Sequence, residues 1–259
     1  MNPDSLRSGD LGQRFLESFE LTPALDPETL DQVYRVRHDV YCRDLGWEET
    51  RPDGRETDAF DEHSWHCLLR RRDTGEAVGC TRLIVPRPDD PKAPLPFEDT
   101  CRDSLDRTVA DPSRMERASL GEVSRLAVVN TFRRRKGEAA VPLPAGDSDF
   151  TPLHEGERER FPFIPVSLYL GAAAMARRLG VEHVFVLTEP RLARHFERIG
   201  VDIRAVGGPV EHRGTRVPSL LSSSKVVQTL RPTIRPLYDV IAASVERAFR
   251  VAGVPSPKA

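Results

Sequence analysis

The chain contains 259 residues, of which 39% are hydrophobic, so it is long and apolar enough to form a domain with a substantial core. Its 38 basic and 40 acidic residues leave a formal charge of -2, which excludes a chain-wide positive field for nucleic acid or anionic membranes. The cysteines form no C-x-x-C pair, and no apolar run approaches the roughly 20 residues of a spanning helix. We therefore expect a cytoplasmic protein with reduced thiols, no transmembrane segment and no nucleic-acid partner.

The first predicted element is a helix that begins at Asp26-Pro27-Glu28 and runs to about residue 43. Aspartate is a favoured N-cap residue, proline suits the first helical position, and an acidic residue favours the first turn. Apolar side chains spaced three and four positions apart form one face of this helix, and Arg37 falls within that face. An arginine at such a position needs a partner.

A β-hairpin is predicted next, because residues 65–69 and 77–85 flank the turn sequence Asp73-Thr74-Gly75. Residues 86–117 are rich in proline and charge, which indicates an excursion from the sheet with one short helix near residues 97–105. Residues 120–129 return to strand composition.

The second half of the chain begins with another loop-like excursion at residues 130–163, after which regular structure resumes. The pattern predicts helices at 166–179, 190–199 and 237–251, with Gly180 and Gly200 ending the first two, and strands at 181–188, 203–206 and 216–221. This order predicts an α/β fold, a mixed sheet with helices on both faces.

We expect three regions in the chain. Residues 1–20 are predicted to form an N-terminal extension and residues 226–259 a C-terminal helical extension. The domain between them, residues 21–225, carries inserts near 86–117 and 130–163.

Charged residues occupy positions where a purely structural chain would place apolar ones. Glu122 and Arg125 lie in an otherwise apolar strand, three residues apart, so they share a side only if a β-bulge inserts an extra residue. We predict that bulge. Each residue alone could belong to a surface ion pair, but the apolar surroundings of the whole set favour one buried polar site. Its predicted members are Arg37, Asp58, Asp61, Arg82, Glu122 and Arg125.

Four motifs in chain order resemble those of the acyl-homoserine-lactone synthases and N-acyl amino acid synthases, members of the acetyltransferase (GNAT) superfamily. The motifs are Arg37-His38-Asp39-Val40-Tyr41 with Gly46-Trp47, the pair Asp58 and Asp61, Gly79-Cys80-Thr81-Arg82-Leu83, and Glu122-Val123-Ser124-Arg125. The resemblance covers residues 21–221. Residues 94–98 and the long insert before Pro165 are most similar to acyltransferases associated with the PEP-CTERM and exosortase protein-sorting system.

The resemblance implies a GNAT-like central sheet that is splayed and bulged, with the arm of an acyl thioester entering at the splay. It implies that Glu122 accepts the amine proton and that backbone N–H groups at the bulge stabilise the oxyanion. Arg82 and Arg125 either hold a carboxylate of the amine substrate or orient Asp58 and Asp61. The six charged residues form the implied catalytic set, and the implied substrate-binding residues are Tyr41, Trp47, Ser124, Leu126 and Val128.

The acyl donor is predicted from the segment after Arg125. Residues 126–136 lack the glycines with which ordinary acetyltransferases cradle the pyrophosphate of coenzyme A. We therefore expect acyl carrier protein with its phosphopantetheine thioester as donor, acyl-CoA as the alternative, and no tightly bound cofactor. Basic side chains could dock the acidic carrier, although they equally suit a solvated turn. These candidates are Arg133, Arg134, Arg135 and Lys136.

The favoured function is transfer of a medium- or long-chain fatty acyl group from acyl carrier protein to the amine of an amino acid or related small molecule. One alternative is an acyl-homoserine-lactone (autoinducer) synthase that uses S-adenosylmethionine. Another is a non-catalytic acyl-binding or regulatory module on the same fold. Asp58, Asp61, His63 and His66 have the residue types of a metal site, but a strand beginning near Trp65 would separate the two histidines, so we expect no metal.

Overall fold

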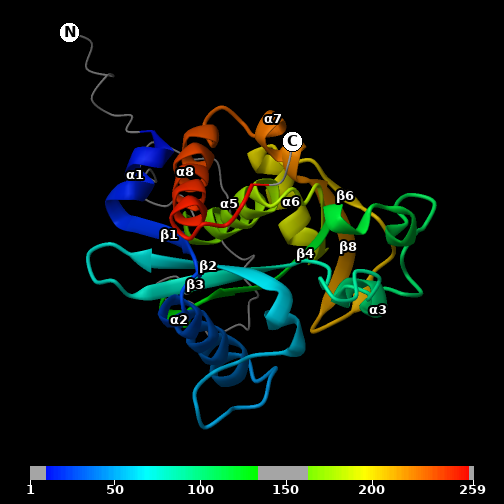
Figure 1. Cartoon of the computed structure of the whole chain (residues 1–259), viewed down its shortest axis with the longest axis horizontal. Helices are drawn as coiled ribbons and strands as arrows, with labels where there is room; N and C mark the ends of the chain where they lie inside the picture. Colours follow the sequence, from blue (N-terminus) through cyan, green and yellow to red (C-terminus); the bar gives the residue numbers. More distant parts are fainter. Residues whose placement is uncertain (1–9, 134–162, 257–259) are drawn as a thin grey trace.

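The computed structural model describes residues 10–133 and 163–256, which form a mixed α/β fold around one eight-stranded sheet (Figure 1). The strand order is β1-β2-β3-β4-β5-β8-β6, and β7 pairs with β8. The strands are β1 Phe19–Pro23, β2 Ser64–Arg71, β3 Ala77–Ile84, β4 Leu120–Val128, β5 His183–Thr188, β6 Ile203–Ala205, β7 Val210–Glu211 and β8 Thr215–Ser222.

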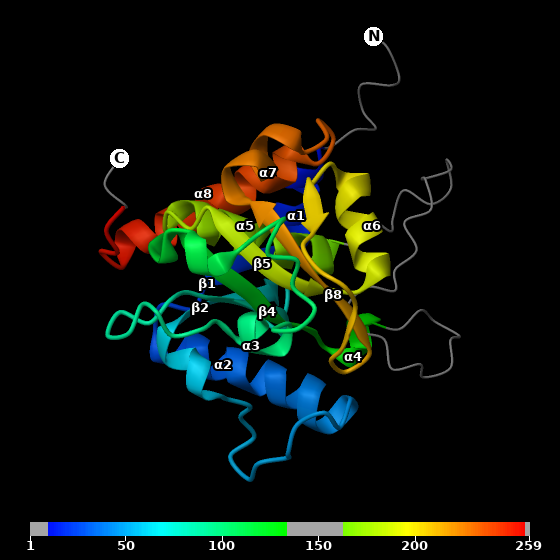
Figure 2. The ribbon, with the colours of Figure 1, turned by 90° about the vertical axis from the view of Figure 1, so that its right-hand side faces the viewer.

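Helices cover both faces of the sheet, as predicted (Figure 2). The α2 helix packs on one face against β2, β3 and β4, while α5 and α8 pack on the other face. None of the helices in the described ranges combines the length and apolarity needed to span a membrane. The helices are α1 Leu11–Ser18, α2 Pro27–Arg37, α3 Pro96–Thr100, α4 Asn130–Arg133, α5 Phe163–Arg178, α6 Pro190–Ile199, α7 Ser223–Thr229 and α8 Arg235–Val251.

The sheet splays between its two central strands. β4 and β5 are parallel neighbours, but they pair only from Leu120 with His183 to Val123 with Val186. β4 continues to Val128 and β5 to Thr188 without further pairing between them. The predicted splay is confirmed, and it leaves the edges of both strands facing a shared space.

The predicted bulge lies in β4. Cys80 of β3 pairs with Ala127, whereas Arg82 pairs with Ser124, so Arg125 and Leu126 together oppose Thr81. Arg125 takes a left-handed backbone conformation, with φ of 50°. A residue in this conformation is typical of a bulge, which bends the strand and re-aims its side chains.

The helix predicted from residue 26 to about residue 43 is present, but its second half differs from the expectation. Asp26 caps α2 through a bond from the Thr29 N–H, and Pro27 is the first helical residue. After Arg37 the chain continues as a π-helical segment, His38–Asp44. Such widened turns are rare and occur often at functional sites. The α2 spacing buries Arg37 completely, as predicted.

The first excursion, residues 86–117, folds against the sheet and builds a small core of its own. Its helix α3 is shorter than predicted, and the segment after it forms a bridge between Leu105 and Gly207. Phe97 of α3 stacks on Phe185 of β5, with ring centroids 4.1 Å apart. This contact holds α3 over the β4–β5 edge. Of the second excursion, α4 is described and residues 134–162 lie outside the described ranges.

Several short elements were not predicted: α1, β1, α7 and β7. β1 adds an antiparallel edge strand to β2, and α1 packs on α8. A five-residue strand carries too little alternation to be distinguished from coil, and its pairing comes only from tertiary contact.

Two glycines in left-handed conformations provide a test of the packing. Gly200 ends α6 with φ of 89°, and a Cβ there would lie 2.4 Å from the carbonyl oxygen of Thr229. Gly214 has φ of 95°, but a Cβ there would meet nothing within 4 Å. We expect Gly200→Ala to lower the free energy of unfolding by about 2–4 kcal/mol, and Gly214→Ala by about 1–2 kcal/mol. Urea denaturation measures both, and equal losses would contradict the steric conflict at Gly200.

Candidate active site

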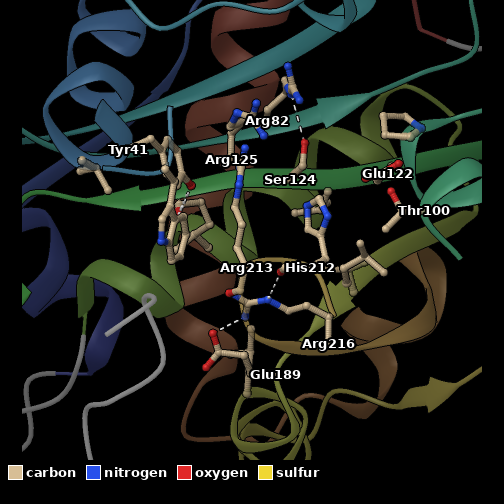
Figure 3. Close-up of a pocket in the computed structure, with 18 of the residues that line it drawn as sticks. Tyr41, Arg82, Thr100, Glu122, Ser124, Arg125, Glu189, His212, Arg213 and Arg216 are labelled. Carbon is tan, nitrogen blue, oxygen red and sulfur yellow. Dashed lines mark hydrogen bonds and ion pairs between the residues drawn. The ribbon is translucent and has the colours of Figure 1, made fainter. Parts of the chain in front are cut away.

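A cavity of about 330 Å³ lies where β4 and β5 separate (Figure 3). The predicted site residues that line it are Tyr41, Trp47, Asp58, Arg82, Glu122, Ser124, Arg125, Leu126 and Val128. Arg37 and Asp61 do not line the cavity; they lie behind it in a buried ion network with Arg82. The β7–β8 hairpin closes the opposite wall with His212, Arg213 and Arg216.

Asp61 is the centre of the buried ion network. Its carboxylate accepts two bonds from Arg37, at 2.6 and 3.1 Å, and one from Arg82 at 2.8 Å. Burial alone would raise the pKa of Asp61, but the Arg37 guanidinium and its other partners hold that pKa far below its ordinary range. The pair Asp58 and Asp61 also forms a reciprocal cap on the 3₁₀ turn Ala59–His63, which fixes both carboxylates.

Arg125 connects this network to the cavity. It donates to Asp58 at 3.0 Å and to Glu56 at 3.2 Å, and Glu56 in turn accepts a bond from Arg37. Glu56 is 4% exposed, and the sequence interpretation missed it. Only an indirect argument could have identified it: a buried arginine such as Arg37 is expected to need more than one carboxylate partner. Burial would raise the pKa of Glu56, yet Arg37 and Arg125 lower it.

Glu122 lies apart from the ion network. Its Oε2 accepts a bond from the Phe97 N–H at 2.8 Å, so α3 seals it against the sheet. Burial raises the pKa of the Glu122 carboxyl to about 7, against the opposing effects of the Phe97 N–H and the charges of Arg82 and Arg125. A carboxyl with this pKa exchanges protons near neutral pH, which suits a general base.

Tyr41 and Trp47 form the aromatic wall that was predicted. The Tyr41 hydroxyl donates to the Leu126 carbonyl at 2.8 Å, next to the bulge, and the two aromatic rings stack with centroids 6.0 Å apart. Ser124 turns toward the ion network, where its Oγ accepts a bond from Arg82 Nε at 3.0 Å. Arg82 is therefore bonded through Nε and Nη1 to Asp58, Asp61 and Ser124, and only 2% of it is exposed.

The cations of the β7–β8 hairpin were not predicted as site residues. Arg213 forms an ion pair with Glu48. Arg216 forms one with Glu189 (Figure 3). Burial lowers the pKa of His212, and the nearby arginines lower it further. The sequence around these residues does not predict that they belong to the site, because the pairing of β8 with β5 is what brings the hairpin to the cavity.

Three other expectations concern metal, thiols and docking. Asp61 is engaged by arginines, and His66 Nε2 lies 3.5 Å from it; across the described ranges, no three His, Cys, Asp or Glu side chains are grouped to hold a metal ion. All four cysteines are buried and unbridged, and burial raises the pKa of Cys80 to about 12. The docking candidates stay a prediction, since Arg134, Arg135, Lys136 and the Arg133 side chain lie outside the described residues.

A domain family and an individual enzyme are similar in sequence to this chain. Residues 36–141 match the family described as acetyltransferase (GNAT) domain. An acyl-homoserine-lactone synthase of Rhizobium radiobacter is 25% identical over 181 residues, which cover 70% of this chain and 72% of that protein.

Solved structures show the same fold. TofI, in a ternary complex with an inhibitor and MTA, has a TM-score of 0.55 at 21% identity and covers 85% of this chain and 95% of its own. The CoA-dependent acyl-homoserine lactone synthase BjaI, with SAM and isopentyl-CoA, has a TM-score of 0.54 at 19% identity and covers 93% and 95%. FeeM, an N-acyl amino acid synthase from uncultured soil microbes, has a TM-score of 0.51 at 13% identity and covers 82% and 94%.

The ion network predicts a large stability loss when its central carboxylate is removed. Asp61→Asn should lower the free energy of unfolding by about 3–5 kcal/mol, because it leaves Arg37 and Arg82 buried with too little negative charge. The matched control is Asp99→Asn, which breaks an exposed pair with Arg102 and should change stability little. Guanidinium denaturation measures both. Similar losses for the two variants would show that the network is not a major source of stability.

Proposed function

We propose that this chain is an acyltransferase that moves a medium- or long-chain fatty acyl group from a thioester to the amine of an amino acid or related small molecule. The match of residues 36–141 to the acetyltransferase (GNAT) domain and the similarity to an acyl-homoserine-lactone synthase support this proposal. The observation that carries the proposal is Glu122, a buried carboxyl with a pKa of about 7 in the wall of the cavity at the β4–β5 splay.

The proposed reaction follows from this position. The amine nitrogen attacks the thioester carbonyl carbon, a C–N bond forms and the C–S bond breaks. Glu122 takes the proton that the nitrogen loses, and the thiolate of the donor leaves and is protonated to the thiol. Backbone N–H groups of β4 beyond Val123, where pairing with β5 has ended, are suited to stabilise the oxyanion.

The cavity offers two chemically different sides. Leu126, Val128, Val186 and Leu192 contribute apolar surface between the separated strands, which suits a fatty acyl chain and its pantetheine arm. Asp58, Arg125 and the hairpin cations make the other side polar. Arg82 is buried and bonded to both aspartates through Nη1, so the geometry supports its role in orienting Asp58 and Asp61 rather than a contact with substrate.

The amine and the donor each have two candidates. The similarity to the Rhizobium radiobacter enzyme supports an acyl-homoserine-lactone synthase that uses S-adenosylmethionine as strongly as an N-acyl amino acid synthase. We propose acyl carrier protein as donor, because no glycine-rich cradle follows β4. Acyl-CoA is the second candidate, since BjaI of the same fold is described as CoA-dependent.

Replacing the proposed base should abolish product formation. In cells that express the protein, Glu122→Gln keeps an acceptor for the Phe97 N–H but cannot take a proton, so acylated product should fall at least about a hundredfold. Mass spectrometry of lipid extracts would identify an N-acyl amino acid or an acyl lactone, which also separates the two candidates. Glu20→Gln, on the exposed edge of β1, is the control. No new acylated product from the wild type, with long-chain donors present, would contradict the enzyme proposal.

The pKa of Glu122 predicts the pH dependence. Below about 7 the carboxyl is protonated and cannot accept the amine proton, so kcat/KM should rise with pH through that value and then level off. Because the folded-state pKa is raised above its ordinary 4.5, Glu122 should also destabilise the fold as pH rises from 4.5 to about 7. Rates of thiol release and urea denaturation across this range measure the two effects. If the wild type and Glu122→Gln showed the same dependence of kcat/KM and of unfolding free energy on pH, the raised pKa of Glu122 and its role as the base would both be refuted.

A further inference from the structure

Two arginines from different parts of the fold share one carboxylate at the cavity wall. Glu48 Oε1 accepts a bond from Arg125 Nη2 at 3.3 Å and a bond from Arg213 Nη2. Glu48 does not line the cavity, whereas both arginines do. Glu48 therefore connects the two guanidinium groups, and both arginines line the cavity (Figure 3).

The backbone presents Arg213 at some energetic cost. Arg213 has φ of 55°, which is unfavourable for any residue with a Cβ, and it is followed by Gly214 with φ of 95°. Arg216 braces this turn, because it donates to the carbonyls of His212 and Arg213 while it pairs with Glu189. Strained residues that the surroundings hold in place are typical of ligand sites.

The two guanidinium groups retain unused donors. Among the described residues, Arg213 makes its side-chain hydrogen bond only through Nη2, and Arg125 uses only Nε and Nη2. The Arg213 guanidinium also lies over the Trp47 ring, 5.8 Å from its centroid, which fixes its plane at the cavity mouth. Planar guanidinium donors in this arrangement match the two oxygens of a carboxylate.

We propose that Arg213 and Arg125 bind the carboxylate of the acyl acceptor, with Glu48 as the residue that positions them. The acceptor is then an amino acid or amino-acid derivative that retains its free carboxylate, and simple amines are poor substrates. This inference rests on the proposed acyl transfer. It places the carboxylate at Arg213 rather than at Arg82, because only 2% of Arg82 is exposed, whereas 28% of the Arg213 side chain is exposed.

The test compares acceptors that differ only in the carboxylate: phenylalanine with phenethylamine, and S-adenosylmethionine with its decarboxylated form. Thiol release from dodecanoyl carrier protein and dodecanoyl-CoA reports turnover. For whichever pair the wild type accepts, the member with the carboxylate should have a lower KM than the member without it. Arg213→Gln should raise that KM about tenfold or more and leave the KM of the decarboxylated member nearly unchanged. Glu48→Gln should raise the KM of the carboxylate-bearing acceptor by less than Arg213→Gln does, because both arginines are still present and lose only the carboxylate that positions them.

The controls separate three failures. Arg204→Gln removes an exposed arginine of β6 outside the cavity and should leave every KM unchanged. An Arg213→Gln protein that is misfolded would lose turnover with both members of a pair, which a thermal unfolding curve would confirm. Equal use of both members by the wild type, or no selective change in Arg213→Gln, would overturn the inference and leave acyl transfer standing. Turnover of none of the four acceptors would count against the proposed function itself.

Discussion

The structure depends on a buried set of opposite charges that are satisfied only together. Arg37, Arg82 and Arg125 come from a helix and two strands, and their carboxylate partners Glu56, Asp58 and Asp61 come from one loop and the turn after it. Each arginine alone would be too costly to bury. Together they fasten α2 and the loop after it to β3 and β4, so the polar wall of the cavity and the stability of the fold have the same origin.

The divergence of β4 and β5 supplies the space in which this polar wall can act. Pairing stops at Val123, one residue after Glu122, and the bulge follows directly at Arg125. Glu122 therefore lies where the sheet is still continuous and buried, while Arg125 lies where the sheet has opened. A single strand thus places a carboxyl of raised pKa and a fixed cation beside the same cavity.

The sequence predicts the longer helices and strands from residue 26 onward, together with the buried position of Arg37. Helix spacing identifies Arg37 as buried, and the interval between Glu122 and Arg125 predicts the bulge, because both features follow from local periodicity. Glu48, Glu56 and Arg213 lie in loops and in a hairpin turn, where no periodicity exists, and only tertiary contacts bring them to the cavity. The π-helical segment after Arg37 was not predicted either, because π-helices are rare and the helical pattern of residues 26–43 gave no reason to expect one.

The bulge also determines on which face of the sheet each later side chain of β4 lies. Beyond it, Ala127 packs with the cluster under α2, and Val128 packs with the main core on the opposite face. If the strand paired regularly at the same length, Leu126 instead of Ala127 would lie opposite Cys80, and all later side chains of β4 would exchange faces. Inserting or deleting one residue elsewhere in β4 would likewise exchange the faces of the side chains on one side of the change. Insertions and deletions among related chains are therefore expected in the excursions on either side of β4.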